Sequence, residues 1–212
     1  MTDILKGTYF VTGTDTEIGK TWTSCRLLEA AVAEGLSAYG LKPVAAGCEE
    51  TGEGLRNEDA VALMQSSSVQ LPYDLVNPVA LSAAIAPHLA AQQEGRSVRL
   101  SQLEGYIKGT LMSRRADLVL VEGAGGWRVP LNASEMLSGL APRLSLQVIL
   151  VVGMRLGCIS HALLTAEAIL RDGCKLAGWV ANDLGAPMPL LEENIATLEQ
   201  LMPAPRIRVT AR

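Results

Sequence analysis

Residues 13–21, Gly-Thr-Asp-Thr-Glu-Ile-Gly-Lys-Thr, constrain the fold of this chain more than any other stretch. A short apolar run, Tyr-Phe-Val at 9–11, precedes them, and a helical pattern of apolar residues begins at Trp22. In this arrangement of strand, glycine-bounded loop and helix, backbone N–H groups and the helix N-terminus can hold a phosphate. Lys20 is placed to reach the β- and γ-phosphates of a nucleotide, and the Thr21 hydroxyl to bind Mg²⁺.

The spacing of this loop departs from the usual phosphate-binding loop by one residue. Four residues normally separate the first glycine from the Gly-Lys-Thr, which would put glycine at position 14. Position 14 is Thr14, and the glycine is Gly13. The alternative is a glycine-containing turn into an ordinary helix, but strand, loop, Lys-Thr and helix together favour phosphate binding.

Strand-like segments alternate with helical patterns along the rest of the chain. We expect strands at 8–12, 38–44, 117–122, 147–152 and 176–181, and helices at 19–33, 57–67, 99–114, 161–171 and 190–202. We expect a loop at 45–56. Residues 71–85 could hold a short strand between prolines, followed by a helical segment around 87–94.

The apolar runs at 117–122 and 147–152 are continuous, which is typical of strands buried on both faces of a parallel sheet. The sequence therefore predicts an α/β fold with a parallel sheet flanked by helices, similar to P-loop NTPases, in one domain spanning 1–212. Hydrophobic residues make up 49%, which argues against disorder.

Charge and cysteine content exclude several classes of protein. The net charge of −4 gives no footprint for nucleic acid or an anionic membrane, and no apolar stretch is long enough to cross a bilayer. The four cysteines form no C-x-x-C pair, so we expect them to be reduced and structural. We expect a cytoplasmic protein.

Ligands of parallel sheets bind beyond the carboxyl ends of the strands, so the residues that follow each strand are the candidates for chemistry. Glu122 ends a buried strand before Gly123-Ala124-Gly125, where a carboxylate could bind Mg²⁺ or could merely cap a turn. Lys42 lies at the carboxyl edge of the second strand, which we expect in the centre of the sheet, and either points into the same crevice as Lys20 or is a solvated lysine. Asp59 alone is consistent with a first-turn acid favoured by the helix dipole.

Asn182-Asp183, after the last expected strand, could contact a nucleotide base or could simply begin a turn.

Several motifs in the same order resemble the dethiobiotin synthetase family. They are residues 9–21 with the shifted loop spacing, 40–45 (Gly-Leu-Lys-Pro-Val-Ala), 53–60, 76–78 (Val-Asn-Pro), 121–127 (Val-Glu-Gly-Ala-Gly-Gly-Trp), 148–153, 156–162 and 178–183. They span nearly the whole chain, so the resemblance is far more specific than a lone nucleotide motif.

The resemblance implies an ATP- and Mg²⁺-dependent ligase that converts 7,8-diaminononanoate and CO₂ (or bicarbonate) to dethiobiotin. One amine captures CO₂ as a carbamate, whose oxygen attacks the γ-phosphate of ATP to give a carbamic–phosphoric anhydride. The second amine then closes the ring and expels phosphate. The resemblance also implies a homodimer in which the diamine binds at the interface between the two subunits.

By resemblance, the catalytic residues are Lys42 and Lys20, and the Mg²⁺ ligands are Thr21, Asp59 and Glu122. The implied ATP-binding residues are Thr16, Glu17, Ile18, Gly19, Lys20, Thr21, Asp59, Glu122, Gly123, Ala124, Gly125, Asn182 and Asp183. The implied substrate-binding residues are Lys42, Ala46, Gly157, Cys158, Ile159 and Ser160, of which 157–160 open a helix whose N–H groups could receive the substrate carboxylate.

Three departures from the family pattern bear on activity. Ala46 stands where Ser or Thr is usual, which removes one hydrogen bond of about 1 kcal/mol. Ser160 stands where Asn is common. Relatives continue past Pro205 into further structure that closes over the adenine, so we expect a weaker or less selective base pocket here, unless this is compensated elsewhere.

These departures leave open a catalytically reduced paralogue that binds nucleotide. A second alternative is a partition-type P-loop ATPase switch, but such proteins carry an extra lysine early in the loop and none is present at 13–15. A third alternative, a cobyrinate-type amidoligase, adds a glutaminase domain for which 212 residues leave no room.

Overall fold

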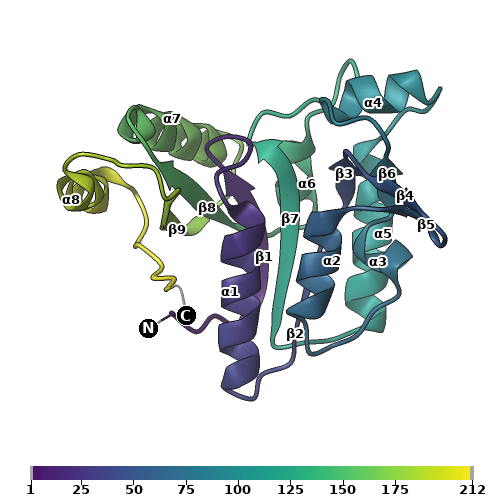
Figure 1. Cartoon of the computed structure of the whole chain (residues 1–212), viewed down its shortest axis with the longest axis horizontal. Helices are drawn as coiled ribbons and strands as arrows, with labels where there is room; N and C mark the ends of the chain where they lie inside the picture. Colours follow the sequence, from purple (N-terminus) through teal and green to yellow (C-terminus); the bar gives the residue numbers. More distant parts are fainter. Residues whose placement is uncertain (1, 211–212) are drawn as a thin grey trace.

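The structure is a computed structural model that describes residues 2–210. At its centre lies a five-stranded sheet in the order β2-β7-β1-β8-β9, and all four neighbouring pairs are parallel (Figure 1). The strands are β1 (Gly7–Gly13), β2 (Ala38–Leu41), β7 (Leu118–Gly126), β8 (Gln147–Met154) and β9 (Leu176–Asp183). The predicted fold class, a parallel sheet flanked by helices, is confirmed.

Helices cover both faces of this sheet. The helices of the described residues are α1 (Lys20–Ala33), α2 (Glu58–Gln65), α3 (Tyr73–Val76), α4 (Pro87–Gln93), which packs away from this sheet, α5 (Leu100–Ser113), the short 3-10 helix Leu137–Gly139, α6 (Leu140–Arg143), α7 (Cys158–Arg171) and α8 (Leu191–Leu201). Successive strand residues point to opposite faces, so Phe10 joins the apolar core under α5, α6 and α7, whereas Val11 joins the core under α1.

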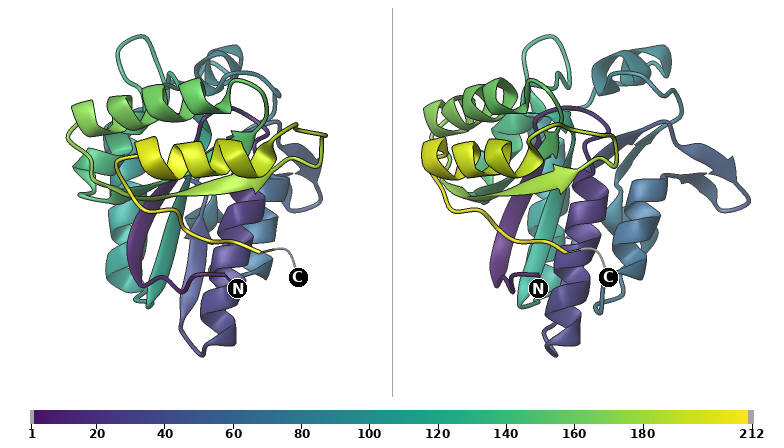
Figure 2. Two further views of the ribbon diagram at one scale, coloured as in Figure 1. Left: turned by 90° about the vertical axis from the view of Figure 1, so that its left-hand side faces the viewer. Right: turned by 60° about the vertical axis from the view of Figure 1, so that its left-hand side comes forward.

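The described residues near the two ends of the chain lie side by side (Figure 2). Backbone bonds between Trp179 and the segment at 205–207 place this segment beside β9. The N–H of Arg208 donates to the Asp3 carboxylate at 2.8 Å, and the N–H of Asp3 donates to the carbonyl of Arg208 at 2.9 Å. The last two residues, 211 and 212, lie outside the described part of the chain, as does residue 1.

The strand expected at 38–44 is split, and its position in the sheet differs from the prediction. β2 ends at Leu41 and lies at the edge of the sheet, not at its centre. Pro43 has no N–H to continue the ladder, and the N–H of Lys42 donates to the carbonyl of Val76 instead. The chain then forms β3 (Val44–Ala46), which pairs in parallel with β6 (Val79–Leu81) in a separate two-stranded sheet.

The short strand expected within 71–85 is present as β6, between Pro78 and Pro87, and the helical segment expected around 87–94 is α4, while Pro72 and Pro78 enclose the short helix α3. Two other local expectations were wrong. The expected loop at 45–56 contains a hairpin, β4 (Glu49–Thr51) and β5 (Gly54–Arg56). β7 continues past Glu122 to Gly126, because residues without bulky side chains still pair with β1 as far as Gly13.

The helix expected from 161 begins three residues earlier, at Cys158, after Gly157 in a left-handed conformation. Within residues 2–210, no helix is long and apolar enough to span a membrane.

Candidate active site

The loop between β1 and α1 is held in place from β9. Gly19, with φ +82°, is the N-cap of α1, and a Cβ atom there would lie 2.1 Å from Nδ2 of Asn182. That Nδ2 donates to the carbonyl of Ile18 at 2.8 Å. Only glycine combines this backbone conformation with so close a neighbour. Asn182 therefore supports the loop from behind, and Gly19 allows α1 to begin directly at Lys20.

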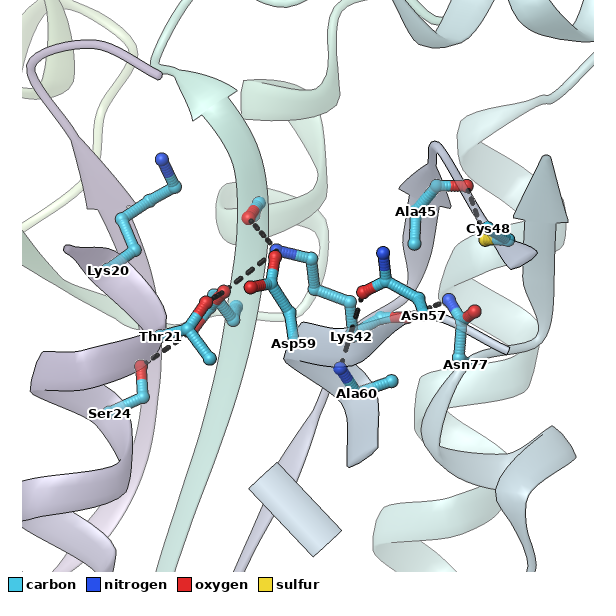
Figure 3. A network of polar contacts seen from close by, with 12 residues as sticks. Lys20, Thr21, Ser24, Lys42, Ala45, Cys48, Asn57, Asp59, Ala60 and Asn77 are labelled. Atoms are coloured by element: carbon cyan, nitrogen blue, oxygen red, sulfur yellow. Dashed lines mark hydrogen bonds and ion pairs between the residues drawn. The ribbon is translucent and has the colours of Figure 1, made fainter. Parts of the chain in front are cut away.

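Lys20 lies along this loop, apart from the acidic side chains of the site. Its Nζ donates to the carbonyl of Asp15 at 3.1 Å, and in Figure 3 no dashed line joins it to Lys42 or Asp59. Burial, and after it the charge of Lys42, lower the pKa of Lys20 to about 8, although Glu122 and Asp59 oppose the shift. A bound phosphate would give the Lys20 ammonium the close anionic partner that it lacks.

Lys42 is buried among acidic and backbone oxygens. Its Nζ lies 2.7 Å from Oε1 of Glu122, 2.8 Å from Oδ2 of Asp59 and 3.2 Å from the carbonyl of Gly123 (Figure 3). Burial alone would lower the pKa of Lys42, but the two carboxylates outweigh it and raise the pKa above its usual value. Lys42 is therefore a fixed positive charge at the end of β2.

Glu122 is fully buried and accepts bonds from α1 as well as from Lys42. The Thr21 hydroxyl donates to its Oε1 at 2.7 Å and the Ser24 hydroxyl to its Oε2 at 2.8 Å. Thr21 and Ser24 are three residues apart and so lie on the same face of the helix. Both carboxylate oxygens are thus satisfied, which allows a charge to be buried between β7 and α1.

Asp59 reaches this cluster from the first turn of α2. Asn57 caps this helix, because its Oδ1 accepts from the N–H of Ala60 at 3.3 Å. Burial would raise the pKa of Asp59, but the charge of Lys42 and its hydrogen bond lower it overall.

The three predicted Mg²⁺ ligands therefore converge, because Thr21 donates to Glu122, and Glu122 and Asp59 share Lys42. Their donors are one hydroxyl and two carboxylates, and Mg²⁺ prefers such oxygen donors, so the residues fit the ion. Among the described residues no group of three or more His, Cys, Asp or Glu side chains could hold a metal by itself. Phosphate oxygens and water would have to complete the coordination, as is usual for Mg²⁺.

A cavity of about 890 Å³ lies over this cluster. Ten predicted site residues line it: Thr16, Glu17, Gly19, Lys20, Thr21, Lys42, Ala46, Asp59, Ala124 and Gly125. Thus both lysines face one crevice, as predicted. Its far wall is mostly small and apolar, formed by Ala45, Gly47, Ala84, Ile85, Ala86 and Pro87, with Arg128 on the side.

The other predicted residues do not line this cavity. Ile18, Glu122 and Asn182 are buried behind its walls, and Gly123 and Asp183 are also absent from its lining. Residues 157–160 form the start of α7 and do not contribute to the cavity of a single chain.

Sequence reasoning did not identify three polar residues of this region. Ser24 could have been found from its spacing after Thr21, and Asn57 was included only as the first residue of the helix expected at 57–67. Arg128, at the cavity wall, pairs through its Nη2 with Oδ1 of Asp172 at 2.8 Å, and Trp127 donates to Oδ2 at 2.8 Å. No local signal links Arg128, in the loop after β7, to Asp172, which follows α7.

Comparison with known proteins identifies the relatives of this chain. A family model described as an AAA domain matches residues 7–209. The ATP-dependent dethiobiotin synthetase BioD of Cellvibrio japonicus is 60% identical over 207 residues, which cover 98% of this chain and 90% of that protein. The protein of the same name from Pseudomonas paraeruginosa is 57% identical over 197 residues, covering 93% and 86%.

The chain belongs to the dethiobiotin synthetase family. It is therefore an ATP-dependent ligase of biotin biosynthesis, as the resemblance in sequence implied. ATP-dependent dethiobiotin synthetase BioD 1 of Escherichia coli O157:H7 belongs to the same group, at 51% identity over 93% of this chain and 87% of that protein.

Solved structures outside the synthetase family share the fold alone. The MinC:MinD cell division complex of Aquifex aeolicus gives a TM-score of 0.57 at 13% identity, covering 94% of this chain and 78% of that one. Chloroplast FtsY of Physcomitrella patens gives 0.53 at 17% identity, covering 96% and 58%.

Proposed function

We propose that the enzyme carboxylates 7,8-diaminononanoate with CO₂ and closes the ring through a carbamate and a carbamic–phosphoric anhydride, with release of ADP and phosphate. The observation that carries this proposal is the position of Lys42. Its buried ammonium lies between two carboxylates, next to Thr21 of the phosphate-binding loop, and faces the same cavity as Lys20.

The nucleotide side of the reaction belongs to the loop. Residues 16–21 wrap the phosphates through backbone N–H groups and the start of α1, and Lys20 balances the negative charge of the γ-phosphoryl group. The lowered pKa of Lys20 supports this role, because an ammonium without a close carboxylate gains most from a bound anion. Gly123, Ala124 and Gly125 approach from β7, and Asn182 and Asp183 lie on the side of the base.

Thr21, Asp59 and Glu122 would hold Mg²⁺. When bound, the ion neutralises charge on the transferring phosphoryl group. Hydrogen bonds from Ser24 and Thr21 to Glu122 keep the oxygens of its carboxylate oriented at the base of the cavity.

Lys42, together with Lys20, acts on the carbamate formed from the substrate. A carbamate is an anion, and a fixed ammonium close to the phosphate-binding loop stabilises it and aligns its oxygen with the γ-phosphate. The small apolar wall that includes Ala46 gives the aliphatic chain of the diamine room.

We further propose a cytoplasmic homodimer in which residues 157–160 of one subunit receive the substrate carboxylate of the other. Two observations support an interface there. The start of α7 is outside the cavity of its own chain, and Leu156 and Leu164 beside it are 97% and 62% exposed.

The test of the proposed function is phosphate release from Mg·ATP in the presence of bicarbonate and 7,8-diaminononanoate. Release should depend on the diamine and should be accompanied by dethiobiotin. Phosphate release at the same rate without the diamine would contradict the proposed synthetase reaction. Slow but diamine-dependent turnover would instead indicate a catalytically reduced member of the family, for which the missing hydroxyl at Ala46 is the first suspect.

Two variants separate the roles of the lysines. Lys42→Gln should abolish turnover while ATP binding survives, because Lys42 is assigned to the carbamate. Lys20→Gln should damage both. Retained turnover in Lys42→Gln would remove Lys42 from the mechanism.

A further inference from the structure

The backbone of Lys42 is held by hydrogen bonds to Asn77 and Val76, two residues with no role in the proposed reaction. Asn77 is 3% exposed and lies between α3 and β6. Its Nδ2 donates to the carbonyl of Lys42 at 2.7 Å and more weakly to that of Val79 at 3.3 Å. The N–H of Lys42 donates to the carbonyl of Val76 at 2.8 Å. Lys42 lies just beyond the end of β2, so these bonds replace the ladder that no longer fixes its backbone.

The hydroxyl of Tyr73 extends this contact to the helix that carries Asp59. It donates to Oδ1 of Asn77 at 3.0 Å and accepts from the N–H of Asn57 at 2.7 Å. Asn57 is the cap of α2, and Asp59 lies in the first turn of that helix. One hydroxyl therefore connects the support of Lys42 to the start of α2.

These contacts form a closed ring. It runs from the Lys42 backbone through Asn77, Tyr73 and Asn57 to Asp59, and the 2.8 Å ion pair between Asp59 and Lys42 Nζ closes it. The guanidinium of Arg56 lies 4.2 Å from the centre of the Tyr73 ring and holds that ring in place. Figure 3 shows Asn77, Lys42, Asn57 and Asp59 side by side at the ends of their elements.

We propose that Tyr73 and Asn77 are positioning residues that set the distance between the Lys42 backbone and Asp59. A lysine side chain has a flexible stem, so a charge that must meet a small anion at one place needs both ends held. Asp59 and Glu122 hold the ammonium, and Asn77 holds the backbone. The hydroxyl of Tyr73 connects these two supports, because it bonds both Asn77 and the N–H of Asn57. The inference rests on the proposed role of Lys42.

The test is Tyr73→Phe, which removes the hydroxyl and keeps the ring. Tyr39→Phe is the matched control, because Tyr39 is buried in β2 and its hydroxyl donates to the carbonyl of Arg114 at 2.9 Å, at the end of α5. Tyr39→Phe loses one hydrogen bond of its hydroxyl and Tyr73→Phe loses two, so both should unfold at slightly lower urea concentration. Only Tyr73→Phe should affect the site.

For Tyr73→Phe we expect kcat to fall about tenfold. The hydrogen bond to Asn77 is lost, and the weaker support of Lys42 raises the barrier of the reaction. The Kd for ATP should stay within about twofold, because the phosphate-binding loop is not part of the ring. Amide hydrogens at 57–61 should exchange faster than in wild type, since the N–H of Asn57 loses its acceptor. Tyr39→Phe should keep kcat within about twofold and leave exchange at 57–61 unchanged.

A kcat for Tyr73→Phe equal to that of Tyr39→Phe would overturn the proposal. Asn77→Asp tests the other side of the ring, because it keeps the acceptor for Tyr73 and replaces the donor to Lys42 by a repelling oxygen. It should show the same loss of kcat with unchanged ATP binding, and unchanged kcat would also overturn the proposal.

Failure of the proposed function has a different signature. In that case the wild type shows no diamine-dependent phosphate release, and the exchange measurement still decides the geometry. Unchanged exchange at 57–61 in Tyr73→Phe would then overturn the ring by itself.

Discussion

The ion pair between Lys42 and Glu122 allows a quantitative prediction about stability. Both side chains are buried, at 4% and 0% exposed, and their charged atoms are 2.7 Å apart. Lys42→Met removes the cation and leaves Glu122 charged in a site without solvent. Removal of one partner of a buried pair costs about 3–5 kcal/mol. We expect the lower end, about 3 kcal/mol, because Glu122 keeps its bonds from Thr21 and Ser24 and Asp59 remains partly solvated.

The reverse change should cost less. Glu122→Gln removes one charge, but Lys42 keeps Asp59 at 2.8 Å and the carbonyl of Gly123 at 3.2 Å. Loss of one charged hydrogen bond costs about 1.5–3 kcal/mol, and we expect about 2 kcal/mol. Simple addition of the two single effects would give about 5 kcal/mol for the double variant.

The double variant should be more stable than this sum. Lys42→Met with Glu122→Gln leaves no unpaired charge in the buried part of the site, so we expect a loss of about 3 kcal/mol and a coupling energy of about 2 kcal/mol. The assay is urea unfolding at about pH 7 with EDTA and no nucleotide. With a slope of about 2 kcal/mol per molar urea, the Lys42→Met midpoint falls by about 1.5 M. Additivity within about 0.5 kcal/mol would refute a buried, directly coupled pair.

Three further predictions concern other parts of the structure. Gly19→Ala should abolish ATP binding in a titration while the fold survives by circular dichroism, because its Cβ would displace Asn182; unaltered binding would contradict this. Asp172→Asn should reduce the melting temperature at neutral pH. Burial raises the pKa of Asp172, but bonds from Arg128 and Trp127 outweigh it and lower the pKa below 3.8, so its stabilisation is present above that pH and lost as pH falls through the folded value. The difference from wild type should therefore shrink below pH 3.8, and a constant difference would exclude the charge as its cause. Ala46→Ser should lower the KM for the diamine, and an unchanged KM would mean that the cavity already satisfies that contact.

The general architecture could be predicted from the sequence because the controlling signals are local. Continuous apolar runs predicted the central strands, and the carboxyl ends of the strands pointed to Lys42 and Glu122 as neighbours of the phosphate-binding loop. The loop itself was recognised from its neighbours rather than from its spacing. All of these inferences depend on short stretches of chain and on the rule that parallel strands end at one edge. Asp59 lies on a helix, so only the family resemblance connected it with the other two.

The errors occurred where tertiary contacts overrule local signals. Lys42 does face the crevice of Lys20, one of the two alternatives left open, but no local signal showed that it is buried between carboxylates 17 and 80 residues away in sequence (59 − 42 and 122 − 42). β2 was expected in the centre of the sheet and lies at its edge, because strand order depends on crossovers that composition does not encode. Prolines suggested breaks around 71–85 but did not say which side would become helix and which strand.

The position of Glu122 explains why charge, and not only shape, organises this site. A carboxylate with no exposed surface would be unstable without partners, so Thr21 and Ser24 on α1 and Lys42 beyond β2 are all drawn toward it. The same arrangement fixes the phosphate-binding helix, the edge strand and α2 relative to β7. It follows that the supports of Lys42, including Asn77, act on the chemistry through geometry rather than by contact with substrate. Variants in this layer should therefore reduce kcat before they reduce ATP affinity.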